Sequence, residues 1–302
     1  MSATLTATTT DERPVYFSAG DATLFGVVTL PKGEPNGIGF MILCGGAIPI
    51  SPNRNRHSVH LCRELATKGY TCLRFDYHGA GESTGLVSRV DLGRTHVDDV
   101  VAAAQVLRDH GADRIVVAGS CGGARNALGA AQSVPDLHSL ILFDMPLRTY
   151  ERGKDRAHER AAQQWGLWEY VRRALRPRTI RGIFNRRLRR AYGAFARERV
   201  RAAKEGTRRP DATADQVEHT ASSVIDELRA VADRGVPTLL VYGDADEYYE
   251  DVKTGMDGAL GSVITSAPNL DLQVLPGEVH GFASLHMQRT LRQIVYDRLG
   301  AR

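Results

Sequence analysis

The stretch of sequence that decides the fold is residues 114–131, RIVVAGSCGGARNALGAA. Residues 115–117 form an apolar run typical of a buried strand, and residues 124–131 are rich in good helix formers. The glycines between these two segments permit a sharp turn of the backbone. The stretch therefore predicts a strand, a tight elbow and a helix in direct succession.

The elbow itself, Gly119-Ser120-Cys121-Gly122-Gly123, fits the pattern glycine, any residue, nucleophile, any residue, glycine, with Cys121 at the centre. A residue at that apex lies at the N-terminus of the following helix, where unpaired N–H groups favour a thiolate. Two other interpretations stay open. The register can shift by one residue and make Ser120 the nucleophile, or Cys121 can be a small packed residue in a glycine-rich turn.

Length and composition favour a large α/β domain with an insertion. The chain has 302 residues, of which 42% are hydrophobic, enough for a sizeable core. No window reaches 18 consecutive apolar residues, and the first residues lack a charged segment followed by an apolar run. The four cysteines lack the spacing of metal ligands. We expect a soluble, cytoplasmic protein with reduced thiols and no metal or cofactor.

Charge is distributed unevenly along the chain. Residues 148–209 hold 20 Lys and Arg against six Asp and Glu, a surplus of 14. Since the formal net charge of the whole chain is +4, the remainder carries −10. The basic segment is therefore predicted to be a separate structural piece.

Outside the elbow, expected strands and helices alternate. The strands are residues 14–18, 22–30, 39–44, 71–77, 139–143, 237–242 and 270–275, and the helices are 57–68, 91–110, about 250–260 and 285–299. Alternation stops after Pro146 for about 90 residues. This order predicts an α/β fold, a mostly parallel, doubly wound sheet with an inserted Arg-rich helical cap. We expect a disordered N-terminus over 1–12, a core formed by 13–147 and 233–302, and a cap over 148–232.

Two later strand ends carry residues suited to catalysis. Residues 243–247, GDADE, follow one predicted strand, and residues 276–282, PGEVHGF, follow the last. In a doubly wound sheet the loops at the carboxyl ends of the strands converge on one crevice. The chain order of nucleophile, acid and histidine resembles the α/β-hydrolase superfamily.

Further stretches carry the same resemblance. Residues 74–83, RFDYHGAGES, resemble a superfamily stretch in which His78 takes the place of the usual arginine. The cysteine at the elbow resembles that of dienelactone hydrolases and of exosortase-associated hydrolases. Two further stretches of this chain, LFGVVTLP (residues 24–31) and LCGGA (residues 43–47), are similar to the exosortase-associated hydrolases.

The resemblance implies a catalytic triad of Cys121, His280 and Asp246, in which His280 is the general base and acid and Asp246 orients it. Asp244 or Asp144 is the alternative acid. The implied oxyanion hole consists of the backbone N–H groups of Gly122 and Gly46. Ala47 is the second choice for the latter donor, and Cys44 stands where the family has histidine.

Within the expected cap, Trp165 and Trp168 are spaced to share one helical face. The two tryptophans either form the hydrophobic core of the cap or cover the substrate pocket. We take Trp165, Trp168 and Ala47 as candidate substrate-binding residues. The surrounding arginines are either a solvated helix face or a recruiting surface for an acidic carrier protein, a coenzyme A phosphate or a carboxylated substrate. Nucleic acid and membrane are not expected partners.

The sequence thus predicts covalent acyl chemistry on a small-molecule ester, thioester or lactone, in secondary metabolism. One alternative is a lyase that eliminates acetate from an acetylated polyketide intermediate of the tetronate type. Another is a catalytically silent binding protein on the same fold. Oligomeric state is left open.

Overall fold

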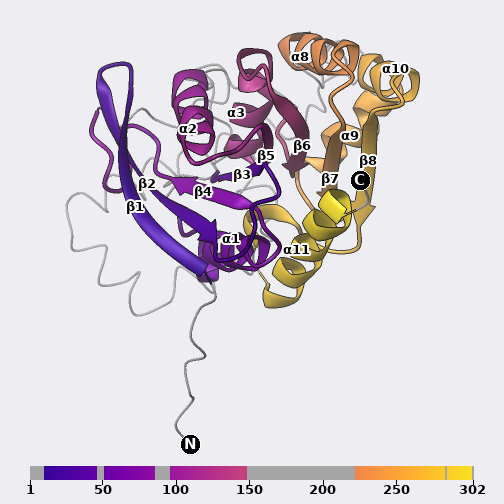
Figure 1. Cartoon of the computed structure of the whole chain (residues 1–302). Coiled ribbons are helices and arrows are strands. Elements are labelled where there is room, and N and C mark those ends of the chain that lie inside the picture. Colours follow the sequence, from indigo (N-terminus) through magenta and orange to yellow (C-terminus); the bar gives the residue numbers. More distant parts are fainter. Residues whose placement is uncertain (1–9, 46–50, 86–95, 148–221, 283, 301–302) are drawn as a thin grey trace, which may run out of the picture. The chain divides into compact units, whose positions relative to one another are not determined.

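The computed structural model describes residues 10–45, 51–85, 96–147, 222–282 and 284–300 (Figure 1). The chain divides into two compact units, one made of Met1–Thr149 with Glu218–Arg302 and the other of Tyr150–Val217. The second unit lies outside the described residues, as do Trp165 and Trp168. No helix among the described residues is both long and apolar enough to cross a membrane.

The first unit is built on an eight-stranded sheet with the order β1-β2-β4-β3-β5-β6-β7-β8. Its first two pairings, β1 with β2 and β2 with β4, are antiparallel, and the other five are parallel. The predicted mostly parallel sheet is therefore confirmed. The strands are β1 (Thr10–Ala19), β2 (Ala22–Pro31), β3 (Ile38–Leu43), β4 (Thr71–Phe75), β5 (Arg114–Ser120), β6 (Leu137–Phe143), β7 (Thr238–Gly243) and β8 (Leu270–Leu275).

Helices cover both faces of this sheet (Figure 1). One face packs against α1 (His57–Ala66) and α11 (Leu285–Gly300). The other packs against α2 (Val97–Asp109), α3 (Gly122–Ala130), α8 (Ser222–Asp233), α9 (Tyr249–Met256) and α10 (Ala259–Ser266). Two predicted helices differ in extent: α2 is described only from residue 97, and the helix expected near 250–260 is two short helices.

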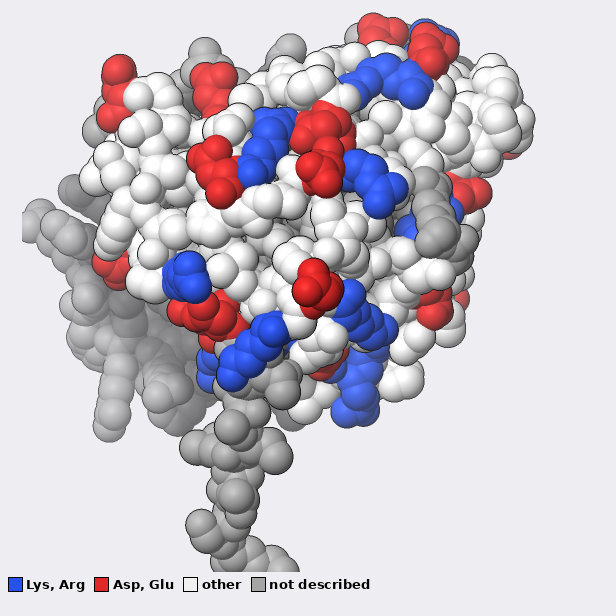
Figure 2. All heavy atoms as spheres, in the orientation of Figure 1, with Lys and Arg blue, Asp and Glu red and all other residues white. Residues whose placement is uncertain are grey.

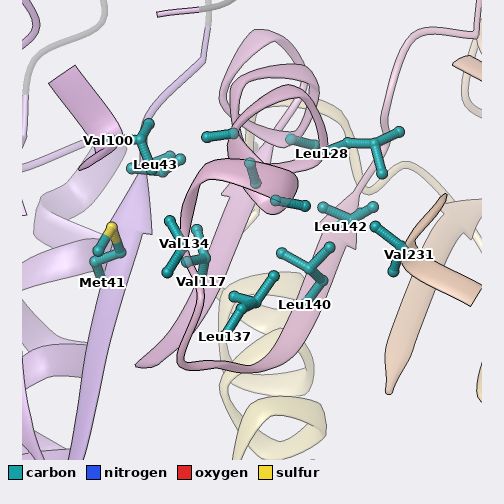
Figure 3. Close-up of a cluster of buried hydrophobic side chains, with 14 of the residues drawn as sticks. Met41, Leu43, Val100, Val117, Leu128, Val134, Leu137, Leu140, Leu142 and Val231 are labelled. Carbon is teal, nitrogen blue, oxygen red and sulfur yellow. The ribbon is translucent and has the colours of Figure 1, made fainter. Parts of the chain in front are cut away.

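The central strands are apolar throughout because both of their faces are buried. Val117, Leu140 and Leu142 lie in the cluster beneath α3, whereas the intervening Val116 and Ile141 lie in the cluster on the α1 side. Figure 3 shows part of the first cluster, with Leu43 of β3 near Val100 of α2 and Leu142 of β6 near Leu128 of α3. A continuous apolar run therefore supplies two separate cores, one to each helix layer.

Two predicted boundaries are wrong. Strand β1 begins at Thr10, so residues 10–12 pair with β2 instead of being disordered. Helix α8, placed in the cap by the sequence, belongs to the core, because Val224 and Leu228 are fully buried in the cluster of α2 and α3. The boundary between the units accordingly falls at residue 217 and not at 232. The sequence signal for this packing is an apolar side of α8, formed by Val224, Ile225, Leu228 and Val231.

The described surface carries charge of both signs. On the face shown in Figure 2, acidic and basic side chains lie interspersed, without a large patch of one sign. The strong positive surplus of the sequence belongs to residues 148–209, which are not described.

Candidate active site

Cys121 occupies the apex of the turn between β5 and α3. Its backbone has φ 50° and ψ −120°, a conformation that residues other than glycine rarely adopt and that is commonly found at functional sites. Ser120 is the last residue of β5, is 6% exposed, and has no such backbone strain. The geometry therefore favours the register with Cys121 at the apex over the one with Ser120.

Three glycines allow this apex to form. A Cβ atom on Gly119 would lie 2.5 Å from the backbone of Gly123, and one on Gly123 would overlap the carbonyl oxygen of Leu43. A Cβ atom on Gly45 would overlap the carbonyl oxygen of Ser120. The end of β3, the elbow and the first turn of α3 thus approach one another at backbone contact, which only glycine permits.

The Cys121 thiol is mostly enclosed. Burial, together with the nearby Asp144 carboxylate, raises the pKa of this thiol to about 11, although hydrogen bonds with the Gly122 N–H and the Tyr248 hydroxyl act in the opposite direction. The hydroxyl oxygen lies 3.9 Å from Sγ. Enclosure of the sulfur therefore opposes the thiolate that a position at a helix N-terminus favours, and we expect the resting residue to be a protonated thiol.

His280 lies in a short turn after β8 and forms a hydrogen-bonded pair with Asp144. Its Nδ1 atom contacts the Asp144 Oδ2 atom, and Asp144, at the end of β6, is only 1% exposed. The hydrogen bond with Asp144 raises the pKa of His280, and burial raises the pKa of Asp144 to about 6. The carboxylate fixes the imidazole orientation and leaves Nε2 available for proton transfer.

Asp246 has a different task from the one predicted. Its two carboxylate oxygens accept hydrogen bonds from the backbone N–H groups of Gly243 (2.7 Å), Val279 (3.0 and 3.1 Å) and His280 (2.9 Å). It therefore orients the main chain that carries His280 rather than the imidazole. The interpretation of Asp246 as the partner of the imidazole is corrected to Asp144, which the sequence had left as an alternative.

Asp244, the other alternative acid, also binds backbone. Its Oδ1 atom accepts a hydrogen bond from the Gly277 N–H at 2.7 Å. Both carboxylates of the β7 loop are thus used to hold the loop that follows β8. Within the described residues, no hydrogen bond or ion pair joins either carboxylate to the His280 ring, which pairs with Asp144.

Tyr248 is a site residue that the sequence analysis missed. It immediately precedes α9, its hydroxyl contacts Cys121 Sγ, and its ring meets the His280 ring edge to face at 5.6 Å between centroids. Its position two residues beyond Asp246, in the same strand-end loop, is the signal that would have identified it.

The implied oxyanion hole is only partly described. The Gly122 N–H lies beside the sulfur, and Gly45 passes so close that its Cβ position would be 2.9 Å from Gly122 N. The loop that continues from Gly45 therefore starts beside the apex, as a second donor requires. Gly46 and Ala47 themselves lie outside the described residues.

The sheet order, the strained apex and the paired histidine on a later strand end together define an α/β-hydrolase. Residues 54–284 match the model of the hydrolase family described as serine aminopeptidase, S33. The chain belongs to this family, and its predicted membership in the α/β-hydrolase superfamily is confirmed. The family description names serine, whereas the apex residue of this chain is cysteine.

Solved structures with the same fold include several kinds of enzyme. The esterase Pf2001 of Pyrococcus furiosus has a TM-score of 0.62 and 17% identity, over 97% of this chain and 91% of the esterase. A thioesterase domain from the curacin biosynthetic pathway has a TM-score of 0.54 and 16% identity, over 94% and 99%. A dienelactone hydrolase from Anabaena variabilis has a TM-score of 0.54 and 14% identity, over 96% of each chain. No curated protein matches the sequence.

Proposed function

We propose that the protein cleaves an ester, thioester or lactone through a covalent acyl intermediate on Cys121. His280 serves as general base and acid, and Asp144 holds its imidazole. The observation that carries this proposal is a strained cysteine at the elbow apex in the same site as an aspartate-paired histidine. The structural likeness to an esterase, a thioesterase domain and a dienelactone hydrolase supports acyl chemistry as the class of reaction.

The reaction begins with a neutral thiol. As Sγ forms a bond to the acyl carbon, its proton passes to His280 Nε2, and the carbonyl oxygen becomes an oxyanion. The Gly122 N–H stabilises that oxyanion. The bond to the leaving alcohol or thiol then breaks, and His280 returns the proton to the departing atom.

A water molecule completes the cycle. His280 removes a proton from this water, whose oxygen attacks the thioester formed with Cys121. Collapse of the second tetrahedral intermediate releases the acid, and the cysteine sulfur recovers its proton from His280. The positive charge that develops on His280 in both halves is stabilised by the buried Asp144 carboxylate.

The test compares three classes of substrate and looks for the intermediate. Purified protein is incubated with p-nitrophenyl esters, acyl thioesters and aminoacyl p-nitroanilides, and its intact mass is measured after rapid acid quench. We expect turnover of the esters or thioesters and an acyl adduct that peptide mapping places on Cys121. Cys121→Ala should abolish both. An adduct on Ser120, cleavage of the anilides alone, or an alkene product formed by elimination would overturn the proposal.

The basic segment supports a second part of the proposal, the form in which the substrate arrives. With a surplus of 14 positive charges over residues 148–209, an acyl group linked to coenzyme A or to an acidic carrier protein is the favoured substrate. Such a substrate fits a role in secondary metabolism. Reversing charge at Arg186-Arg187 and Arg189-Arg190 should raise KM for the linked acyl group and remove its salt dependence, with kcat nearly unchanged.

A further inference from the structure

A second cluster of potential ligands lies where the end of β4 meets the beginning of α2. His78 follows β4, His96 directly precedes α2, and Asp99 lies in the first turn of that helix. One ligand atom from each of the three side chains can be chosen so that all lie within 4.8 Å of one another. His78 Nδ1 lies 2.9 Å from Asp99 Oδ2, and His96 Nδ1 lies 3.8 Å from the same oxygen.

We propose that His78, His96 and Asp99 bind one divalent transition-metal ion of the zinc type. Two imidazoles and one carboxylate form a donor set that suits such an ion. Bonds of about 2.0–2.2 Å would separate two ligands of a tetrahedral ion by about 3.3 Å. The two Asp99–histidine separations, 2.9 and 3.8 Å, fall on either side of that value, and all three ligand atoms lie within 4.8 Å of one another, so side-chain movements of up to about 1.5 Å would complete the site.

The carboxylate of Asp99 supports a bound cation. Its side chain is only 4% exposed, and within the part of the chain that the structure describes its ion pairs are with the two histidines and with no Lys or Arg. Asp99 Oδ2 also accepts a hydrogen bond from the His78 backbone N–H at 3.0 Å, and the N-terminus of α2 favours its charge, so a metal ion would add the full positive charge that these contacts do not supply. His78 stands where the resembled superfamily stretch has arginine, a residue that can neutralise an acid but cannot bind a metal.

The surroundings hold the histidines in place. The His96 ring stacks on Tyr77 at 4.8 Å between centroids, and its backbone N–H donates to Asn126 Oδ1 at 3.2 Å. Binding of the ion through His78 Nδ1 would replace the hydrogen bond between that atom and Asp99. The ion would link the β4 loop to α2.

The test titrates zinc chloride and cobalt chloride into chelator-treated protein, in a Cys121→Ser background that removes the active-site thiol as a competing ligand. Calorimetry should give one equivalent of tightly bound metal, and zinc should raise the melting temperature. His78→Arg and His96→Gln should each weaken binding by more than about 100-fold, because even changes behind the ligands cost 10–100-fold. His286→Gln, at an exposed histidine on α11, is the matched control and should bind as the parent does.

His78→Arg also separates metal binding from a purely structural role. An arginine can still pair with Asp99, so the metal-free variant should melt close to the metal-free parent while its response to zinc disappears. If parent and variants take up metal equally, or if the parent takes up none at millimolar zinc, the proposal is wrong. In that case the two histidines serve only as hydrogen-bond partners of Asp99 at the beginning of α2.

Discussion

Replacing each of two buried aspartates by asparagine separates catalysis from stability. Among the described residues, the Asp144 side chain forms its hydrogen bond with the His280 imidazole, so Asp144→Asn removes the acceptor that orients the ring. We expect kcat to fall by about 10³–10⁴-fold, the scale found when a triad acid becomes an amide. Since burial raises the pKa of Asp144, its charge costs folding energy at neutral pH, and the free energy of unfolding should stay level or increase.

Asp246→Asn should have the opposite profile. The carboxylate accepts hydrogen bonds from three backbone N–H groups, and bonds to a charged acceptor contribute about 1.5–3 kcal/mol each. An amide keeps one oxygen and turns its NH₂ group toward backbone donors, so the free energy of unfolding should fall by about 2–4 kcal/mol. The loss of activity should be smaller than that of Asp144→Asn and should follow from displacement of the histidine loop.

The assays are urea unfolding and the rate of ester or thioester cleavage, measured on both variants. The pH profile adds a third readout, because loss of Asp144 should lower the pKa of His280 whereas loss of Asp246 should change it less. The opposite result would contradict this assignment. If Asp246→Asn loses about 10³-fold in kcat with unchanged stability while Asp144→Asn stays active, then Asp246 is the catalytic acid, and the pairing of His280 with Asp144 is not the arrangement used in catalysis.

Three further predictions address the thiol, the base and the elbow. Tyr248→Phe should raise the pKa of the cysteine thiol, shifting its alkylation by iodoacetamide to higher pH, whereas Tyr249→Phe should not. The pKa of His280 is raised above 6.5, and a protonated imidazole cannot accept the thiol proton, so kcat/KM should increase as the pH rises through that pKa. A flat profile from pH 5 to 8 would contradict this. Gly123→Ala places a Cβ on backbone and should cost about 1–3 kcal/mol in unfolding experiments, while Gly33→Ala, in open space, should cost little.

Local patterns were sufficient to predict the sheet and the elbow. Apolar runs identified every central strand, because strands buried on both faces admit few polar residues, and the glycine spacing identified the apex because backbone contact tolerates no side chain. These features depend on residues near one another in sequence. They require no knowledge of how distant loops are oriented.

The identity of the catalytic acid and the charge state of the nucleophile could not be predicted from the sequence, because both depend on how distant loops are oriented. Asp144, Asp244 and Asp246 all follow strands, and only the directions of the loop N–H groups decide which carboxylate is left for the imidazole. The sequence shows that a helix begins after Cys121, but it does not show how completely the thiol is enclosed. The contribution of α8 to the core was missed for the same reason, since its apolar side could equally have faced a cap.

The hydrogen bonds of Asp246 also bear on how this enzyme can be redesigned. The position of the histidine loop is set by main-chain N–H groups, and the loop residues Pro276, Gly277 and Glu278 are exposed. Side chains at Pro276 and Glu278 therefore contribute little to holding the base in place. Glu278 nevertheless acts on the base, because its carboxylate helps to raise the pKa of His280. A library that randomises Pro276 while keeping Glu278 and Asp246 would therefore vary the exposed part of this loop with both the position and the pKa of the base maintained.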